Sequence, residues 1–288
     1  MKIALGTVQF GLDYGVSNPN GKVAFDEVES ILNFAKKHGV TYLDTAMGYG
    51  LSEQVIGSYK TNNNDYNFKI ITKIPDIESH TSSIKDLVEN ALIRLACNQV
   101  YGLLFHTAEN INTKTFEELL LLKEQGKIHK LGVSVYSPEQ AFFIANNFNI
   151  DLIQLPLNVF DQRFISSGCL RFLKDKGIEV HTRSLFLQGL LLQPLNDINS
   201  YFQPHLKSLN RFNDFCLSHK LSTLDVALSL VNFVENVDKF VIGVCSKLQL
   251  SEILKSQAKT ADIKLDIKTL SSTEETLINP SLWNIEKK

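Results

Sequence analysis

The 288-residue sequence lacks long apolar runs and a strong charge of either sign. No stretch approaches the roughly 18 apolar residues that a transmembrane helix needs, and residues 1–6 form too short an apolar run for a signal peptide. The formal net charge is −2, so the composition favours neither a nucleic acid nor an anionic membrane as a partner. We therefore expect a cytoplasmic protein that binds neither.

The sequence also has few cysteines and no Cys-x-x-Cys pair. Cys97, Cys169, Cys216 and Cys245 lie far apart along the chain. We expect reduced residues of the core or surface, and not a disulfide framework or a zinc site. No other set of residues has the spacing of metal ligands, so no metal is predicted.

Short apolar runs alternate with longer amphipathic segments throughout the chain. We predict eight strands, at residues 2–5, 41–44, 69–73, 100–105, 130–133, 152–155, 179–182 and 240–242. Most intervals between them have helical periodicity; Val28, Ile31, Leu32 and Ala35, for example, recur on one helix face. This alternation favours an α/β fold with a closed parallel (β/α)8 TIM barrel over an open doubly wound sheet. No linker interrupts the chain, so residues 1–288 are predicted to form one domain.

Helix boundaries are indicated at several places. Asp26 with Glu29, and Ser222 with Asp225, resemble capping boxes at helix starts, and Gly39 can end a helix in the left-handed conformation.

The stretch 188–221 is less regular than the rest. It predicts a loop over the barrel mouth followed by a helix near 206–219. Loops of this length often serve as substrate lids, and a plain connection is an equal alternative. Trp283, in the C-terminal tail, is expected to pack over the barrel in preference to reaching the substrate.

Three predicted strands end in a titratable side chain: Asp44, Lys73 and His106. Tyr49 follows the first of them, between two glycines. In a (β/α)8 barrel the active site lies at the C-terminal ends of the strands. A charged residue there is often only the first solvated loop residue, and a lone histidine is more often structural. Recurrence at three strand ends, with a tyrosine beside one, argues against coincidence.

These four side chains suit the reduction of a carbonyl group, which needs a hydride on carbon and a proton on oxygen. A free tyrosine has a pKa of about 10 and is a weak acid at neutral pH. The ammonium of Lys73 is expected to lower the pKa of Tyr49, with Asp44 keeping that lysine charged. His106 is expected to polarise the substrate oxygen or to share the proton. No nucleophile or metal site accompanies them, so the electrons must come from a cofactor.

The chain resembles the aldo-keto reductase superfamily. The matching stretches are Asp44-x-Ala46-x-x-Tyr49-Gly50-x-x-Glu53, Ile71-Thr72-Lys73 and Leu103-Leu104-Phe105-His106. The resemblance implies that Tyr49 is the general acid/base, that Lys73 and Asp44 tune it, and that His106 orients the carbonyl. It implies an NAD(P)H-dependent reductase of a small aldehyde, ketone or sugar-like substrate.

The same resemblance implies where the cofactor binds. The candidate cofactor-binding residues are Gly6, Thr7, Ser134, Gln154, Arg183, Gly243, Ser246, Lys247, Gln249 and Glu252. Among them, Ser134 and Gln154 would hold the nicotinamide amide, and residues 241–252 the adenosine phosphate end. The family does not use a G-x-G-x-x-G fingerprint, so the absence of one here does not exclude a nicotinamide nucleotide.

Three positions depart from the family pattern. Val135 stands where an asparagine is usual, and Arg183 where an aromatic residue often stacks on the nicotinamide. Gln249 replaces the arginine that commonly selects the 2′-phosphate of NADP, and Lys247 is a possible substitute. The resemblance therefore implies NADP(H) ahead of NAD(H). Arg183 would stack, or grip a phosphate or acidic substrate, or simply be a solvated arginine of the mouth.

Two alternatives to the reductase stay open. One is a regulatory protein that senses nicotinamide redox state on the same barrel with little turnover. The other is an unrelated barrel hydrolase or isomerase, which would need no dinucleotide. The remaining histidines are expected to be structural or on the surface: His38, His80, His129, His181, His205 and His219. The sequence does not indicate the oligomeric state.

Overall fold

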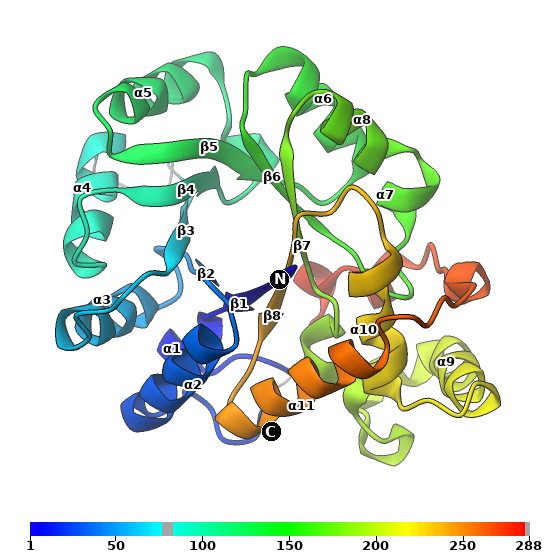
Figure 1. Ribbon diagram of the computed structural model, residues 1–288. Helices are drawn as coiled ribbons and strands as arrows, with labels where there is room; N and C mark the ends of the chain where they lie inside the picture. The colour runs from blue at the N-terminus through cyan, green and yellow to red at the C-terminus, as the bar shows by residue number, and fades with distance from the viewer. Residues whose placement is uncertain (77–82, 286–288) are drawn as a thin grey trace.

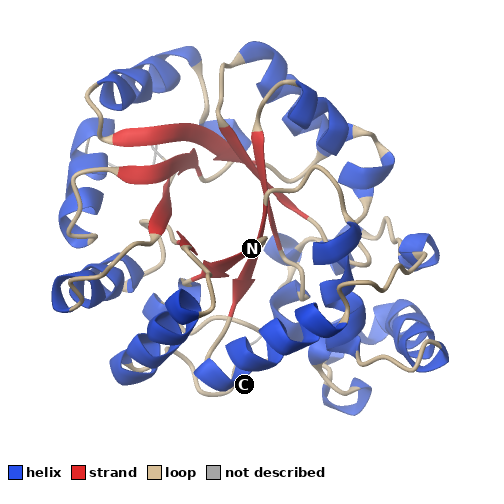
Figure 2. Cartoon of the chain, in the orientation of Figure 1, coloured by secondary structure: helices blue, strands red, loops and turns tan. Residues whose placement is uncertain are grey.

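Eight parallel strands form a closed barrel in which each strand pairs with its neighbours in chain order and β8 pairs with β1. The computed structural model describes residues 1–76 and 83–285, and helices surround its ring of strands (Figures 1 and 2). The strands are β1 (Ile3–Gly6), β2 (Tyr42–Asp44), β3 (Lys69–Ile74), β4 (Val100–Phe105), β5 (Ile128–Ser134), β6 (Leu152–Pro156), β7 (Glu179–Arg183) and β8 (Lys239–Gly243). The predicted (β/α)8 barrel is confirmed, and the open sheet is excluded.

All eight predicted strands are present, and most of them end one residue later than their apolar runs. β1, β5, β7 and β8 each gain one last residue, namely Gly6, Ser134, Arg183 and Gly243. Parallel strands are joined through backbone groups, so a ladder continues past the point where side chains turn polar. The residues that the apolar pattern omits are thus those that face the carboxyl end of the barrel.

Helices follow most of the strands. The longer ones are α2 (Phe25–Lys37), α3 (Ser52–Asn62), α4 (Ile84–Arg94), α5 (Thr113–Glu124), α6 (Pro138–Asn147), α8 (Cys169–Asp175), α9 (Leu206–Ser218), α10 (Thr223–Phe233) and α11 (Lys247–Lys259). The shorter ones are α1 (Val8–Gly11), α7 (Arg163–Ser166), α12 (Glu275–Ile278) and the 3₁₀ turns η1 (Ala108–Asn110) and η5 (Ile267–Leu270). In the described ranges, no helix has the length and apolar character needed to cross a membrane.

Two of the three helix-boundary predictions are confirmed. Ser222 and Asp225 form a reciprocal capping box at the start of α10, and Gly39, just beyond α2, has φ of 76°. The capping box at Asp26 is wrong. Because α2 begins at Phe25, Asp26 lies inside the first turn, where a carboxylate interacts favourably with the helix dipole without capping it.

The excursion between β7 and α10 consists of three 3₁₀ segments and one helix. The 3₁₀ segments are η2 (Leu187–Leu192), η3 (Leu195–Asp197) and η4 (Ser200–His205), and α9 confirms the helix predicted near 206–219. Trp283 follows η6 (Pro280–Leu282) and packs edge-on against Phe202, with ring centroids 4.8 Å apart. The tail therefore packs against this excursion, as expected.

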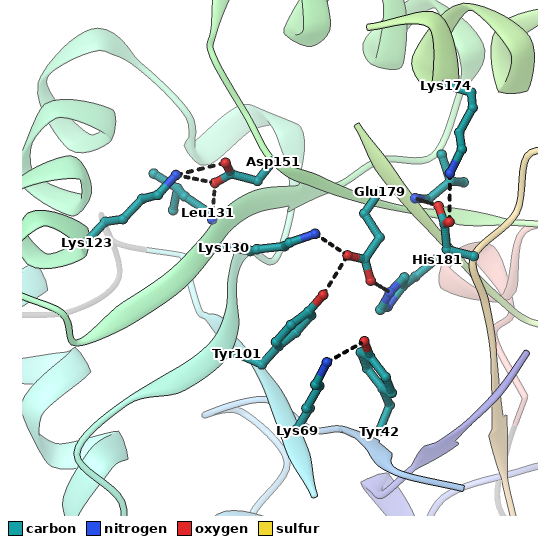
Figure 3. A network of polar contacts seen from close by, with 12 residues as sticks. Tyr42, Lys69, Tyr101, Lys123, Lys130, Leu131, Asp151, Lys174, Glu179 and His181 are labelled. Atoms are coloured by element: carbon teal, nitrogen blue, oxygen red, sulfur yellow. Dashed lines mark hydrogen bonds and ion pairs between the residues drawn. The ribbon is translucent and has the colours of Figure 1, made fainter. Parts of the chain in front are cut away.

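Polar contacts fill the N-terminal end of the barrel (Figure 3). Glu179 accepts hydrogen bonds from the hydroxyl of Tyr101 at 2.7 Å and from Lys130, and contacts Nε2 of His181 at 2.6 Å. Burial opposes ionisation of Glu179, but these hydrogen bonds more than offset it and hold its pKa well below the usual range. His181 is fully buried within this network.

The other histidines of the described residues also have local contacts. His38 and His219 lie at helix ends against Phe34 and Phe215, and His205 contacts the carboxylate of Glu274. His129 is exposed, and His80 lies outside the described residues. Two of the cysteines, Cys169 and Cys216, are buried in the core.

Gly57 offers a test of how closely α3 and α4 pack. A β-carbon at this position would lie 2.0 Å from the backbone oxygen of Arg94. We expect Gly57→Ala to force the helices apart and to lower the free energy of unfolding by about 1–3 kcal/mol, measured by urea denaturation. Gly48→Ala, where nothing lies within 4 Å of the added carbon, should change it by less than about 0.5 kcal/mol. Equal losses in the two variants would contradict this packing argument.

Candidate active site

A cavity of about 770 Å³ opens at the carboxyl ends of the strands. Five strands contribute their last residue to its wall: Gly6, Asp44, Ser134, Arg183 and Gly243. Residues of η2 and η3 also line it. The loop predicted over the barrel mouth therefore does line the cavity, and the cavity lies where a (β/α)8 barrel places its chemistry.

A buried ion pair forms the floor of the site. The Nζ of Lys73 lies 2.5 Å from Oδ1 of Asp44 and also donates to the backbone oxygen of Thr45 at 2.9 Å. The side chains of the pair are 1% and 5% exposed. The side-chain amide of Gln154 donates to the other carboxylate oxygen at 2.7 Å. The pair is thus fixed in position, since both carboxylate oxygens and the ammonium have close partners.

Tyr49 and His106 face the cavity side by side above this floor. Their rings meet edge to face with centroids 5.9 Å apart, and the Nζ of Lys73 lies 5.2 Å from the Tyr49 ring centroid. Gly11 fixes the turn that holds the tyrosine, because a β-carbon there would lie 1.9 Å from the backbone oxygen of Tyr49. The structure therefore brings the four predicted catalytic residues together.

The protonation of Tyr49 differs from the expectation. Burial raises its pKa well above the usual range, the Asp44 carboxylate raises it further, and Arg183 acts in the lowering direction. The prediction that Lys73 lowers the pKa of Tyr49 is wrong for this structure. The charge of Lys73 is compensated by Asp44, and burial lowers the pKa of Lys73 itself. Tyr49 therefore holds its proton at neutral pH.

His106 is neutral in the same pH range. Burial, followed by the charge of Lys73, lowers its pKa to about 4. The site thus presents a protonated tyrosine and an uncharged imidazole to whatever occupies the cavity. Both can donate or accept a hydrogen bond at a carbonyl oxygen.

Most of the predicted cofactor-binding residues line the cavity. These are Gly6, Thr7, Ser134, Gln154, Arg183, Gly243, Gln249 and Glu252. Ser246 and Lys247 are not among the lining residues. The hydroxyl of Ser246 instead accepts from the backbone N–H of Gln249 and caps α11. The backbone N–H of Lys247 donates to the Glu27 carboxylate at 2.6 Å, and its Nζ lies 5.9 Å from the Phe34 ring centroid.

Sequence reasoning missed several residues that shape the cavity. Tyr14, Gln9, Tyr136 and Phe186 all line it. Tyr136 comes two residues after Ser134 and its ring supports the Arg183 guanidinium, with 4.2 Å between the guanidinium carbon and the ring centroid. Tyr14 lies in the loop before α2, where no periodic pattern indicates its direction. Only its position between two strand-end motifs would have drawn attention to it.

Comparison with known proteins identifies the family to which the chain belongs. A model of the aldo/keto reductase family matches residues 2–275. The chain belongs to this family. It is 29% identical over 178 residues to an uncharacterized oxidoreductase, YqkF, and 26% identical over 193 residues to the aldo-keto reductase YhdN, both of Bacillus subtilis (strain 168). The matched segments cover 57% and 65% of this chain, but only 57% and 56% of those two relatives.

Solved structures agree on the fold. The holo form of the aldo-keto reductase AKR11C1 from Bacillus halodurans superposes with a TM-score of 0.75 at 19% identity, over 94% of this chain and 92% of that one. The family match and this superposition agree on a (β/α)8 barrel of the aldo/keto reductase family.

The burial of His106 predicts a pH dependence of stability. Its pKa is lower in the folded chain than in the unfolded chain, so between about pH 6.5 and 4 the unfolded chain binds the extra proton. This contribution makes stability fall as the pH falls through that window. In His106→Gln the free energy of unfolding should fall less steeply, by up to about 1.4 kcal/mol per pH unit. Urea denaturation at pH 7, 6 and 5 measures both slopes, and identical slopes would contradict the argument.

Proposed function

We propose that this aldo/keto reductase family member reduces an aldehyde, a ketone or a sugar-like carbonyl compound to an alcohol, with hydride from a nicotinamide nucleotide and a proton from Tyr49. One observation supports this above all. A protonated Tyr49 and a neutral His106 face the same cavity above the buried Lys73–Asp44 pair. A carbonyl oxygen that reaches both rings would have a proton donor and a second hydrogen-bonding group.

The cavity wall has polar groups that fit a nicotinamide nucleotide. Ser134 and Gln154 are paired in register on β5 and β6 and both line the cavity. Since the amide nitrogen of Gln154 donates to Asp44, its side-chain oxygen is left to accept a hydrogen bond from a ligand amide. The Oε1 of Gln9 is buried without a hydrogen-bond partner among the described residues, which suits a ligand that supplies a donor. When bound, the nucleotide supplies the hydride.

Side chains of the protein donate the proton and stabilise the charge that its loss leaves. Tyr49 donates its hydroxyl proton to the carbonyl oxygen, and the positive charge of Arg183, which acts against the raised pKa of Tyr49, stabilises the phenolate that remains. Asp44 holds the Lys73 ammonium 5.2 Å from the centroid of the Tyr49 ring. Neutral His106 orients the carbonyl by a hydrogen bond and adds no charge to the site. Because its pKa is raised, Tyr49 keeps its proton across the neutral range and gives it up only to an oxygen that gains negative charge as the carbonyl is reduced.

Replacing Tyr49 by phenylalanine tests the proton donor. General acid catalysis contributes roughly 10²- to 10⁴-fold, so Tyr49→Phe should lose most carbonyl reduction at saturating nucleotide and keep nucleotide affinity. Steady-state rates and nucleotide fluorescence titration measure the two. Tyr66→Phe is the matched control, because the Tyr66 hydroxyl has no partner among the described residues and lies outside the cavity. Activity of Tyr49→Phe near the wild-type rate would remove Tyr49 as the acid.

Coenzyme preference is proposed as NADP(H) ahead of NAD(H), by a narrow margin. The resemblance favours NADP(H), with Lys247 as the cation near the adenosine end. The contacts at the N-terminus of α11 act in the opposite direction. Glu27 supplies a carboxylate to the backbone of Lys247, and the Lys247 ammonium lies over Phe34. A negative charge at this helix end opposes a 2′-phosphate.

Glu27→Gln tests this balance. The variant keeps a side-chain oxygen for the backbone N–H of Lys247 and removes the negative charge. It should tighten NADPH binding by about 3- to 10-fold, since a charge pair near a surface is worth on the order of 1 kcal/mol, and change NADH binding by less than about twofold. Fluorescence titration with each nucleotide gives the dissociation constants. Equal changes for NADPH and NADH would show that Glu27 does not oppose the phosphate.

The redox-sensing alternative differs from the reductase in turnover. Val135 is fully buried and provides no amide contact, which supports slow chemistry on a bound nucleotide. Mixing the protein with NADPH and NADH, and then with a panel of aldehydes and sugars, separates the two. Binding with turnover supports the reductase, and binding without turnover supports the sensor. Binding of neither nucleotide would contradict both.

A further inference from the structure

Arg183 is a cation of the active-site cavity without a carboxylate partner. It is the last residue of β7, is half-buried and lines the cavity. Across residues 1–76 and 83–285, no carboxylate oxygen forms an ion pair with its guanidinium. Arg163, nearby in the fold, differs sharply: it lies 2.8 Å from Asp161 and 2.6 Å from Glu275. A partly buried charge without a counterion is unfavourable, and a ligand of opposite charge relieves it.

The guanidinium is held in one orientation before any ligand binds. It lies over the Tyr136 ring at 4.2 Å and donates weakly to the backbone oxygen of Val135 at 3.3 Å and to the Ser184 hydroxyl at 3.4 Å. Tyr136 is itself fixed, because its backbone N–H donates to Gln140 at 2.7 Å and its backbone oxygen accepts from Arg163 at 3.1 Å. These contacts leave N–H groups of Arg183 free in a preorganised planar fork.

The positive charge of Arg183 acts on the end of the cavity that contains Tyr49 and His106. Arg183 influences the pKa values of Tyr49, Lys73 and His106. Of these groups, Lys73 is compensated by Asp44, and Tyr49 and His106 are neutral. Arg183 therefore leaves this end with one uncompensated positive charge. Asp197 and Glu252 also line the cavity, but neither carboxylate forms an ion pair with Arg183.

We infer that Arg183 binds a carboxylate carried by the carbonyl substrate, so that the substrate class is an aldehyde or ketone acid. This rests on the proposed reduction. One fixed positive charge matches a monoanionic carboxylate better than a dianionic phosphate ester, and the guanidinium fork matches the two carboxylate oxygens. Leu185 and Phe186 line the cavity beside Arg183 and provide apolar contact for the carbon skeleton between the two groups.

Two aldehydes that differ in charge test the inference. The full-length protein with saturating NADPH is given 4-carboxybenzaldehyde or its neutral methyl ester. The readout is the ratio of kcat/KM for the acid to kcat/KM for the ester, because any effect of Arg183 on Tyr49 cancels in it. Arg183→Gln should lower this ratio about 10- to 100-fold, mainly through the KM of the acid. Arg183→Lys should retain part of it. Arg171→Gln, at an exposed arginine paired with Asp175, should leave it unchanged.

Several results would overturn the inference. An unchanged ratio in Arg183→Gln would show that Arg183 does not bind the substrate carboxylate. If the kcat/KM values of both aldehydes also fall equally and nucleotide binding weakens, Arg183 contacts the cofactor instead. If the wild-type protein reduces neither aldehyde, the proposed function fails, and binding decides the carboxylate site separately. Calorimetry of the nucleotide-loaded protein should then show benzoate binding at least 10-fold more tightly than benzamide, with the difference lost in Arg183→Gln. No difference in the wild-type protein would reject the site.

Discussion

The buried contact between Lys73 and Asp44 is the interaction on which the active site depends. Each charge alone would be costly at this depth, and together they are stable only because further groups complete their hydrogen bonding. The backbone oxygen of Thr45 and the amide of Gln154 do so. Asp44, Lys73 and Gln154 come from β2, β3 and β6, which only a closed barrel brings to one floor. Tyr49 and His106 face the cavity above this pair, and burial favours the neutral form of both.

The two ends of the barrel differ: polar contacts at the N-terminal end stabilise the fold, and the carboxyl end contains the candidate active site. At the N-terminal end, Glu179 is hydrogen-bonded to Lys130 and contacts His181, so its charge has partners within the protein (Figure 3). At the carboxyl end, Arg183 keeps a charge that its neighbours leave unmatched. The first arrangement lowers the energy of the folded chain by itself. The second is completed only by a ligand, which is the usual condition of a binding site.

Sequence reasoning predicted the fold and the four reacting side chains because both follow from local rules. Apolar runs alternating with amphipathic helices identify a barrel, and a barrel brings strand ends such as Asp44, Lys73 and His106 together. What it could not predict depends on neighbours distant in the chain. The pKa of Tyr49 is raised by burial and by Asp44, and Arg183, distant in the chain, acts against this shift. The position of the Lys247 backbone depends on its hydrogen bond to Glu27, which lies at the other end of the sequence. The start of α2 was misplaced because a weak cap signal stood two residues inside the helix.

The seam between β1 and β8 also bears on how the site is assembled. Gly6 pairs with Gly243 there, and both line the cavity, so one wall is built from opposite ends of the chain. Bringing such distant segments together carries a larger loop-closure entropy than pairing adjacent strands. A partly folded intermediate that has formed β2 to β7 but not this seam would already contain the Lys73–Asp44 floor. It would nevertheless lack the wall, so competence to bind ligand would arise only as the ring closes.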